Sequence, residues 1–367
     1  MILMNDFKAE PQALRRATVA AVQRVLKSGW YVLGSEVVSF EKAWAERCGT
    51  QSAIGVGNGM DAIEIALRGL DIGPGDEVIT TSMTAFATVL AIIRAGATPV
   101  LADIEGDTGL MSLDSVKRCL SEKTKAILLV HLYGQVRNMP DWQEFCRHFG
   151  LALLEDCAQA HLAGQGGRVA GSFGVAGAYS FYPTKNLGAI GDGGMLVTSS
   201  DRLAERSRRL RNYGQSVRYE HPELGMNSRL DELQAAILSV RLRWLDQFTK
   251  RRREIAKRYQ TELENTHILQ LALPQEPTAH VYHLYVIKCE QRDPLQRYLL
   301  TKDIQTHIHY PIPVHKQDPC LGLKRDSRGL MQTEMHADTC LSLPCHPAMT
   351  EDEVSLVIAS VNDFMKS

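Results

Sequence analysis

One lysine lies where its amine could serve as a nucleophile. Lys185 follows the apolar, strand-like segment Ala178–Phe181 and precedes a glycine-rich turn at Gly191–Gly194. Burial in such a place lowers the pKa of a lysine, and the resulting neutral amine can form an imine with an aldehyde. A lone lysine beside a turn is more often an exposed loop residue, so the functional interpretation depends on the residues around it. The hydroxyl of Ser180, five residues earlier, could bind the phosphate of a molecule whose aldehyde meets the lysine.

Two adjacent acids end another strand-like segment. Glu155 and Asp156 follow an apolar run, and the carboxyl edge of a parallel strand is where α/β proteins bind ligands. Side chains alternate along a strand, so only one of these carboxylates can face a ligand. There it could keep the ring nitrogen of a pyridoxal cofactor protonated. We take Asp156 as the candidate; the alternative is a solvated pair that caps the next helix. The sequence leaves open whether Gln159 and His161 contact the same ligand.

A glycine-rich turn is a third candidate. Residues Gly55–Asp61 read GVGNGMD and lead from an expected strand into the helical pattern Ala62–Leu70. Backbone N–H groups at a helix N-terminus can bind a phosphate, because glycines allow close approach and the helix dipole favours an anion. The alternative is an ordinary tight turn. The segment has neither the Gly-Lys-Ser/Thr of a Walker loop nor the full G-x-G-x-x-G spacing of a dinucleotide site.

The elements around these residues alternate between short apolar runs and longer helical stretches. This alternation of strands and helices predicts an α/β fold, in which a mainly parallel sheet is covered by helices on both faces to give a three-layer α/β/α domain. The expected strands are Ala53–Val56, Glu77–Thr80, Thr98–Leu101, Ala126–Val130 and Leu151–Leu154. A helix begins after Pro11 and ends at Gly29.

The pattern changes after a long helical segment that starts near Arg229. We read the basic run Lys250–Arg253 as a solvated helix face near a domain boundary. Beyond it we expect a smaller α+β domain, and we divide the chain into residues 1–245 and 246–367. Its expected elements are strands at Val281–Ile287 and Ile304–Ile308 and helices at Pro294–Leu300 and Glu351–Phe364.

Composition excludes several classes of protein. The 41 Lys and Arg residues nearly balance the 42 Asp and Glu residues, so charge gives no argument for nucleic acid or an anionic membrane. The eight cysteines are scattered without a metal-ligand spacing, so we expect reduced thiols and no metal site. No apolar run approaches 18 residues and the N-terminus is not a signal peptide, so we expect a cytoplasmic protein with no membrane contact.

Together these motifs resemble those of the DegT/DnrJ/EryC1/StrS sugar aminotransferases, which are pyridoxal enzymes of fold-type I. The resemblance covers nearly the whole chain, in blocks that keep their order. Besides the three candidates above, the matching blocks are Gly29–Gly34, Gly225–Ala236, His309–Pro311 with Pro313 and His315, and Ser342–Pro344.

The resemblance implies a role for each site residue. Lys185 would form the imine with pyridoxal 5'-phosphate and carry the proton, and Asp156 would pair with the ring nitrogen. Gln159 would lie near the ring oxygen. The remaining implied contacts are Gly59, Met60 and Ser180 with the phosphate, Asn227 with the neighbouring subunit's phosphate, and Trp30, Tyr31, His309, Tyr310 and His315 with the sugar nucleotide. A homodimer with active sites at its interface follows.

Two positions depart from the family pattern. Met60 stands where a threonine or serine is common, which would leave only its backbone donor for the phosphate. An aromatic residue that often covers the ring would fall at Ala85, while Phe86 is one position later. In a strand Phe86 would face away, whereas a helix start could still present it.

The resemblance also implies a reaction. L-glutamate would give its amino group to the cofactor, leaving pyridoxamine 5'-phosphate, which would aminate a nucleotide-linked keto sugar. The block Thr306–His315 looks most like members that act on a dTDP-3-keto-6-deoxyhexose. A C4 keto sugar or a keto-cyclitol is the alternative acceptor. Three other functions fit the sequence less well. A pyridoxamine-dependent sugar dehydratase would lack Lys185, and a non-catalytic sensor would not need Lys185 and Asp156. A nicotinamide dehydrogenase would need an acidic residue about twenty positions after the Gly57 turn, and Asp76 fits that spacing only roughly.

Overall fold

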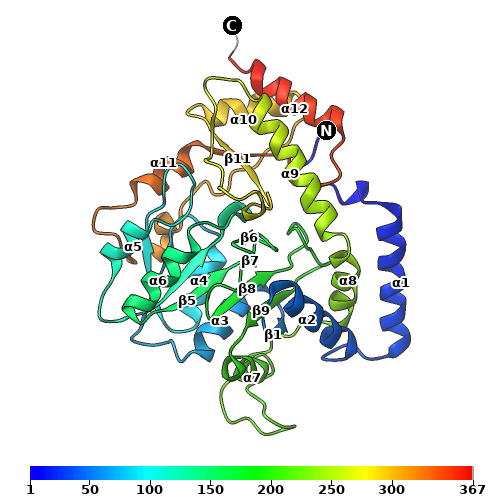
Figure 1. The fold of residues 1–367 in the computed structure, drawn as a ribbon, viewed down its shortest axis with the longest axis vertical. Helices are drawn as coiled ribbons and strands as arrows, with labels where there is room; N and C mark the ends of the chain where they lie inside the picture. Colours follow the sequence, from blue (N-terminus) through cyan, green and yellow to red (C-terminus); the bar gives the residue numbers. More distant parts are fainter. Residues whose placement is uncertain (366–367) are drawn as a thin grey trace.

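The centre of the fold is an eight-stranded sheet with the strand order β1-β9-β8-β5-β4-β2-β3-β12 (Figure 1). The structure is a computed structural model that describes residues 1–365. The strands of this sheet are β1 (Ser52–Val56), β2 (Glu77–Thr81), β3 (Thr98–Ala102), β4 (Thr124–Val130), β5 (Ala152–Asp156), β8 (Ala176–Ser180), β9 (Gly194–Thr198) and β12 (Lys324–Arg325). All neighbours pair in parallel except β9, which is antiparallel to β1 and β8.

All five strands expected from the apolar runs are present, and the sheet is mainly parallel. One detail of the expectation is wrong. We expected the five strands to pair in parallel with one another, but β1 pairs only with β9, because β9 and β8 lie between it and β5. The segment that carries Lys185 therefore connects β8 to β9 at the ligand-binding edge.

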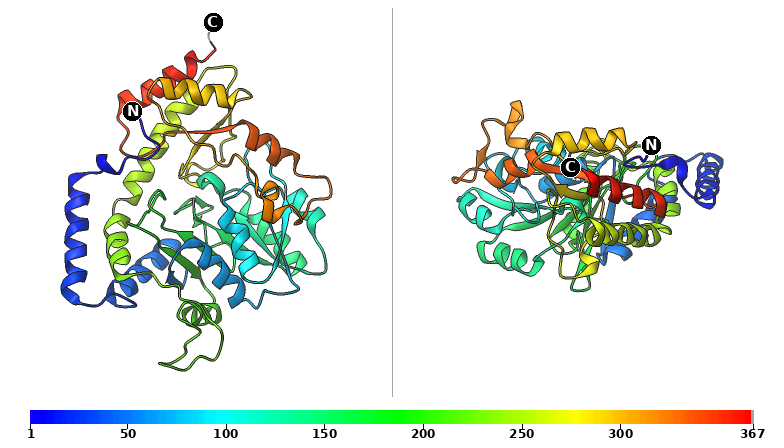
Figure 2. Two further views of the ribbon diagram at one scale, coloured as in Figure 1. Left: turned by 180° about the vertical axis from the view of Figure 1, so that it is seen from behind. Right: turned by 90° about the horizontal axis from the view of Figure 1, so that it is seen from above.

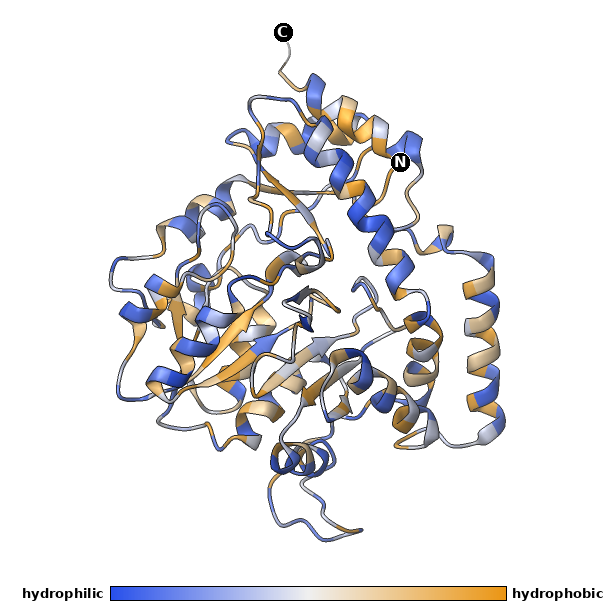
Figure 3. Ribbon diagram, viewed as in Figure 1, coloured by the Kyte–Doolittle hydropathy of each residue, from blue (hydrophilic) through white to orange (hydrophobic). Residues whose placement is uncertain are grey.

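Helices cover both faces of the sheet, so the three-layer arrangement is confirmed. One core contains residues of α2 (Ser35–Cys48), α5 (Leu113–Cys119), α6 (Met139–Phe149) and α8 (Glu232–Leu242). The other contains residues of α3 (Gly59–Gly69), α4 (Phe86–Arg94) and α7 (Asp201–Leu210). Strand alternation divides neighbours between the cores, as with Leu153 and Leu154. Figure 3 shows the apolar residues concentrated along the strands.

The N-terminal helix α1 (Gln12–Ser28) lies along α8 at the side of the molecule (Figures 1 and 2). Ala21 and Val25 pack on Ala236 of α8. The helix ends as predicted at Gly29, whose φ of +67° lies in the left-handed region that glycine adopts without a steric cost.

A smaller α+β unit lies beyond the lysine edge of the sheet. Its three-stranded sheet consists of β10 (Leu269–Gln270), β11 (Tyr285–Lys288) and β13 (Cys340–Leu343). Packed with it are α9 (Leu245–Glu262), α10 (Arg292–Thr301) and α12 (Glu351–Asp363). The remaining elements are α11 (Met331–Thr339), the hairpin β6 (Gly164–Gln165) and β7 (Arg168–Val169), and short 3-10 helices at Phe7–Ala9, Leu132–Gly134, Pro277–Ala279, Val314–Lys316 and Asp318–Cys320.

Several expectations for this second half need correction. Ile304–Ile308 is not a strand: Ile304 bridges to Ile2 and His307 to Ser342, with no ladder between them. The strand expected over Val281–Ile287 forms only from Tyr285, because Val281 bonds to Gly134 instead. The division at residue 245 stays a prediction, although α9 begins at Leu245.

The basic run on α9 is not uniformly a solvated face. Lys250 is exposed, but Arg252 is buried and its Nη1 donates to the carbonyl groups of Tyr282, His283 and Cys345. The burial of Arg252 could not be predicted from the run of basic residues, because the carbonyl groups that bind it belong to loops distant in the sequence. Within residues 1–365, no helix has the length and apolar character needed to cross a bilayer.

Candidate active site

Three of the candidate motifs meet at one edge of the large sheet. Asp156 ends β5 and Ser180 ends β8, and these two strands are parallel neighbours. Gly59 begins α3 after β1. A Cβ atom built on Gly59 would lie only 2.7 Å from the Cβ of Ser180, so this glycine allows the helix end to approach the strand end. The phosphate and ring sites implied by the sequence are therefore adjacent.

The N-terminus of α3 is organised to bind an anion. Oδ1 of Asn58 caps the helix by accepting from the N–H of Asp61 at 2.9 Å. The N–H groups of Gly59 and Met60, which come earlier in the first turn, have no partners within the helix and can bind an anion. Aligned peptide dipoles add partial positive charge there. Ser228, which no sequence motif indicated as a site residue, supports this turn: its Oγ accepts from the N–H of Gly57 at 2.9 Å and donates to Asp61 at 2.7 Å.

Glu155 and Asp156 face opposite sides of the sheet, as the alternation predicted. Glu155 is fully buried and accepts hydrogen bonds from His131 and from three backbone N–H groups of residues 171–174, all at 2.7–2.8 Å. His131, Glu155 and Cys157 bring three potential metal ligands within 4.8 Å. Both oxygens of Glu155 already hold the 171–174 turn, so we assign this cluster to structure.

Asp156 is held at the site by two hydrogen bonds. Oδ1 accepts from the N–H of Ala158 at 3.1 Å, and Oδ2 accepts from the hydroxyl of Thr88 at 2.8 Å. Thr88 in turn contacts the hydroxyl of Thr84 at 2.8 Å. Neither threonine could be predicted from the sequence, since nothing in the pattern shows that α4 packs against the end of β5. The neighbouring Phe86 is the first residue of α4 and not part of a strand.

Lys185 is half-buried beside this edge. Burial lowers its pKa to about 8, and the nearby Asp156 carboxylate opposes part of this shift by stabilising the ammonium form. A substantial fraction of the amine is therefore neutral near pH 8, as imine formation requires. Asn186 anchors the loop, because its side-chain amide donates to the carbonyl oxygen of Val281 at 3.0 Å.

Gln159 lies between the cofactor residues and the smaller unit. Its Oε1 accepts from the N–H of Tyr133 at 2.6 Å, and its Nε2 donates to the hydroxyl of Tyr310 at 3.2 Å. Burial raises the pKa of Tyr310 to about 12. By contrast, His161 is fully buried against Tyr179 and Phe181, which favours a packing role.

The two histidines expected at the sugar end differ in their surroundings. His309 is partly buried, its Nδ1 lies 2.8 Å from Oγ of Ser342, and burial lowers its pKa to about 4. His315 is buried with both ring nitrogens engaged, by Ser82 at 2.7 Å and Glu334 at 3.0 Å. The bond to Ser82 joins His315 to the loop after β2, and its expected sugar contact stays a prediction.

Trp30, Tyr31 and Asn227 are not part of this group in the single chain. Trp30 and Tyr31 lie between α1 and α2 and are 63% and 50% exposed. The carbonyl of Tyr31 accepts from the N–H of Glu232 on α8. Within residues 1–365, neither aromatic ring contacts another ring, and the exposed Asn227 side chain has no hydrogen bond.

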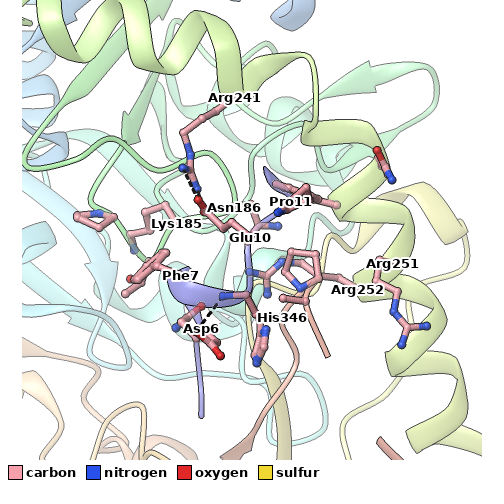
Figure 4. Close-up of a pocket in the computed structure, with 18 of the residues that line it drawn as sticks. Asp6, Phe7, Glu10, Pro11, Lys185, Asn186, Arg241, Arg251, Arg252 and His346 are labelled. Carbon is pink, nitrogen blue, oxygen red and sulfur yellow. Dashed lines mark hydrogen bonds and ion pairs between the residues drawn. The ribbon is translucent and has the colours of Figure 1, made fainter. Parts of the chain in front are cut away.

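A cavity of about 460 Å³ lies beside the lysine loop (Figure 4). Lys185 and Asn186 line one side, the N-terminal segment around Phe7 and Glu10 lines another, and residues of α8 and α9 close it. Asp156 is not among the lining residues. The cavity and the strand-edge site therefore share the loop that carries Lys185.

These residues fit pyridoxal 5'-phosphate. The helix N-terminus beside Ser180 suits a phosphate, the lysine with a lowered pKa suits an aldehyde, and the buried Asp156 carboxylate suits a protonated ring nitrogen. An α/β/α domain with this set on one strand edge and a smaller α+β unit above it defines a fold-type I pyridoxal-phosphate enzyme.

The chain belongs to the DegT/DnrJ/EryC1/StrS aminotransferase family, whose model matches residues 12–362. It is 44% identical, over 99% of each chain, to a dTDP-3-amino-3,6-dideoxy-alpha-D-galactopyranose transaminase of Aneurinibacillus thermoaerophilus. It is 43% identical, over 98% of this chain and 95% of the relative, to a dTDP-3-amino-3,4,6-trideoxy-alpha-D-glucose transaminase of Streptomyces venezuelae.

A solved structure agrees over the whole chain. The crystal structure of S. venezuelae DesV in complex with a ketimine intermediate superposes with a TM-score of 0.96 at 42% identity, covering 100% of this chain and 99% of that one. The chain is thus a pyridoxal-phosphate-dependent aminotransferase with the fold-type I architecture.

Proposed function

We propose that the chain transfers the amino group of L-glutamate to C3 of a dTDP-linked 3-keto-6-deoxyhexose. Two relatives above 40% identity are named as transaminases of dTDP-3-amino sugars, which supports both the nucleotide and the position. The observation that carries the chemistry is Lys185, whose pKa is lowered to about 8 by burial, next to the edge where Asp156 ends its strand.

When bound, pyridoxal phosphate supplies an electron-accepting ring and the carbon that carries the amino group between substrates. Asp156, held by Thr88 and the N–H of Ala158, would keep a proton on the ring nitrogen. The N–H groups of Gly59 and Met60 and the hydroxyl of Ser180 would bind the phosphate. Gln159 would donate its amide N–H toward the ring oxygen.

Lys185 would move the proton. Its neutral amine would remove the proton from Cα of the donor and later return one to C3 of the sugar, so it acts as base and then as acid. A pKa near the working pH allows both steps, since neither protonation state is then rare. Tyr310 and His309 would border the sugar, because Tyr310 already contacts Gln159.

A homodimer would complete each site. Asn227 is exposed and Trp30 and Tyr31 are largely exposed, which suits side chains that reach a partner subunit's cofactor and sugar nucleotide. Further large apolar side chains are exposed in the loop after α7, among them Val217, Tyr219 and Leu224. Buried in an interface, such residues would stabilise a dimer. A cytoplasmic location stays a prediction.

The test is an acceptor comparison with purified, cofactor-loaded protein. L-glutamate is supplied with dTDP-3-keto-6-deoxyhexose, with the dTDP-4-keto isomer, or with a keto-cyclitol, and the product is identified by mass spectrometry and NMR. Amination at C3 of the first sugar supports the proposal. Preferential amination of either other acceptor would replace the substrate assignment, and no amination of any of the three would overturn it.

A further inference from the structure

Tyr133 occupies an unusual backbone conformation beside the site. It follows β4 in the 3-10 turn Leu132–Gly134, with φ +62° and ψ −2°, and its side chain is fully buried. This left-handed region is unfavourable for a bulky side chain, so surrounding contacts must maintain it. One of these contacts is the hydrogen bond from its N–H to Oε1 of Gln159 at 2.6 Å.

That bond fixes which end of the Gln159 amide faces the site. A backbone N–H can only donate, so the partner atom of Tyr133 must be the amide oxygen. The NH₂ group then points toward Tyr310, whose hydroxyl lies 3.2 Å away. The turn packs closely on Gln159, because a Cβ built on Gly134 would lie 2.7 Å from the carbonyl oxygen of Gln159, so only glycine fits there.

The hydroxyl of Tyr133 acts on the sugar end. It lies 2.6 Å from the carbonyl oxygen of His309 and 2.8 Å from Nε2 of His336. A carbonyl can only accept, so the single hydroxyl proton points to His309 and the proton of the second bond comes from His336. His336 must therefore carry its proton on Nε2.

The surroundings of His336 agree with this assignment. The residue is 2% exposed and burial lowers its pKa to about 4, so the ring is neutral at pH 7. Its Nδ1 has no hydrogen-bond partner among residues 1–365, which suits an unprotonated nitrogen better than a buried N–H. The ring stacks on Tyr133 with centroids 5.9 Å apart.

We propose that Tyr133 is a positioning residue that sets both ends of the active site at once: its N–H orients the Gln159 amide toward the cofactor ring, and its hydroxyl holds the His309–Tyr310 segment that borders the sugar. The first bond and the tautomer of His336 follow from the structure alone. The effect on sugar binding rests on the proposed function.

The first test needs neither cofactor nor turnover. Protein labelled with ¹⁵N in its histidines is examined by long-range ¹H–¹⁵N NMR, and His336 is assigned from the spectrum of His336→Phe. We expect the Nε2–H tautomer at pH 7. The Nδ1–H tautomer would mean that Tyr133 donates to His336 instead of His309, and would overturn the proposal.

The second test separates the two ends. Tyr133→Phe keeps the N–H bond to Gln159 but removes the hydroxyl, so we expect KM for the keto sugar to rise about tenfold, the scale of one lost buried hydrogen bond. KM for L-glutamate and the visible absorption maximum of the bound cofactor should stay unchanged. His336→Phe is the matched control, since it keeps a stacked ring and leaves the bond to His309 intact. Its KM for the sugar should change less than about twofold.

Other outcomes contradict the proposal. An equal rise in sugar KM for both variants would show that packing, not the hydroxyl, is responsible, and melting temperatures identify a variant that is simply unfolded. If Tyr133→Phe does not fold, the tautomer of His336 in the wild-type protein still tests whether the Tyr133 hydroxyl donates to His309. Wild-type protein that aminates no sugar would refute the proposed function, while the tautomer result would stand or fall separately.

Discussion

The hydroxyl of Thr88 lies 2.8 Å from Oδ2 of Asp156 and joins the first turn of α4 to the end of β5. Through this bond a helix on one face of the sheet fixes the carboxylate that the cofactor ring needs. Strand alternation directs Glu155 to the opposite side of the sheet, where three backbone N–H groups of the 171–174 turn bind both of its oxygens.

Replacing Thr88 should weaken catalysis without unfolding the protein. Thr88→Val keeps the shape but removes the donor to Asp156, and we expect kcat to fall about tenfold because one hydrogen bond to a charged group is lost. Thr84→Val is the control, since Thr84 contacts Thr88 and not the carboxylate. Steady-state kinetics measure both, and equal losses in the two variants would argue against a special role for Thr88.

The adjacent acids should give opposite phenotypes. Glu155→Gln removes a buried charge that accepts from three backbone N–H groups and His131, so we expect unfolding to become easier by about 2–4 kcal/mol. Its cofactor spectrum should remain that of the wild type. Asp156→Asn should lose most activity with little loss of stability. Urea unfolding and absorbance distinguish the two, and a reversed pattern would reassign the site carboxylate.

The lowered pKa of Lys185 can be measured in cofactor-free protein. The neutral amine is the reactive form, so the rate of acylation of Lys185 should rise with pH and level off above a midpoint near pH 8. Because Asp156 raises the pKa of Lys185, Asp156→Asn should move the midpoint to lower pH. Pulse labelling with peptide mass spectrometry measures the rates. A midpoint near 10.5, the ordinary value for lysine, would show that the lysine is not buried as described.

Gly59→Ala tests the phosphate site. The added methyl would lie 2.7 Å from Cβ of Ser180 and push the helix end away from the strand end. We expect affinity for pyridoxal phosphate to fall more than about tenfold, the scale of one lost phosphate contact. Gly322→Ala is the control, since no atom lies within 4 Å of its added methyl. Unchanged binding by Gly59→Ala would place the phosphate elsewhere.

Sequence patterns predicted the large domain well because its strands are short buried runs separated by helices. They failed where distant segments decide the structure. Ile304–Ile308 looked like a strand but is held by single bridges to Ile2 and Ser342. Arg252 looked solvated, yet loops from two other parts of the chain bury it.

The candidate site shows the same division. Lys185, Asp156 and Ser180 could be found because each stands at the end of a local pattern. Thr88 and Ser228 act through tertiary contacts that no spacing reveals. Tyr133 carried a weak signal, since it follows the end of β4 at the same sheet edge. His315 shows the converse, a motif residue whose ring nitrogens are both engaged inside the protein.

The central claim is that Lys185 bonds covalently to the cofactor. The most direct measurement is borohydride reduction of the cofactor-loaded protein, followed by peptide mass mapping of the pyridoxyl label. We predict one label per chain, on the peptide that contains Lys185, and none in Lys185→Ala. A label on any other lysine, or none in protein that binds pyridoxal phosphate, would contradict the account.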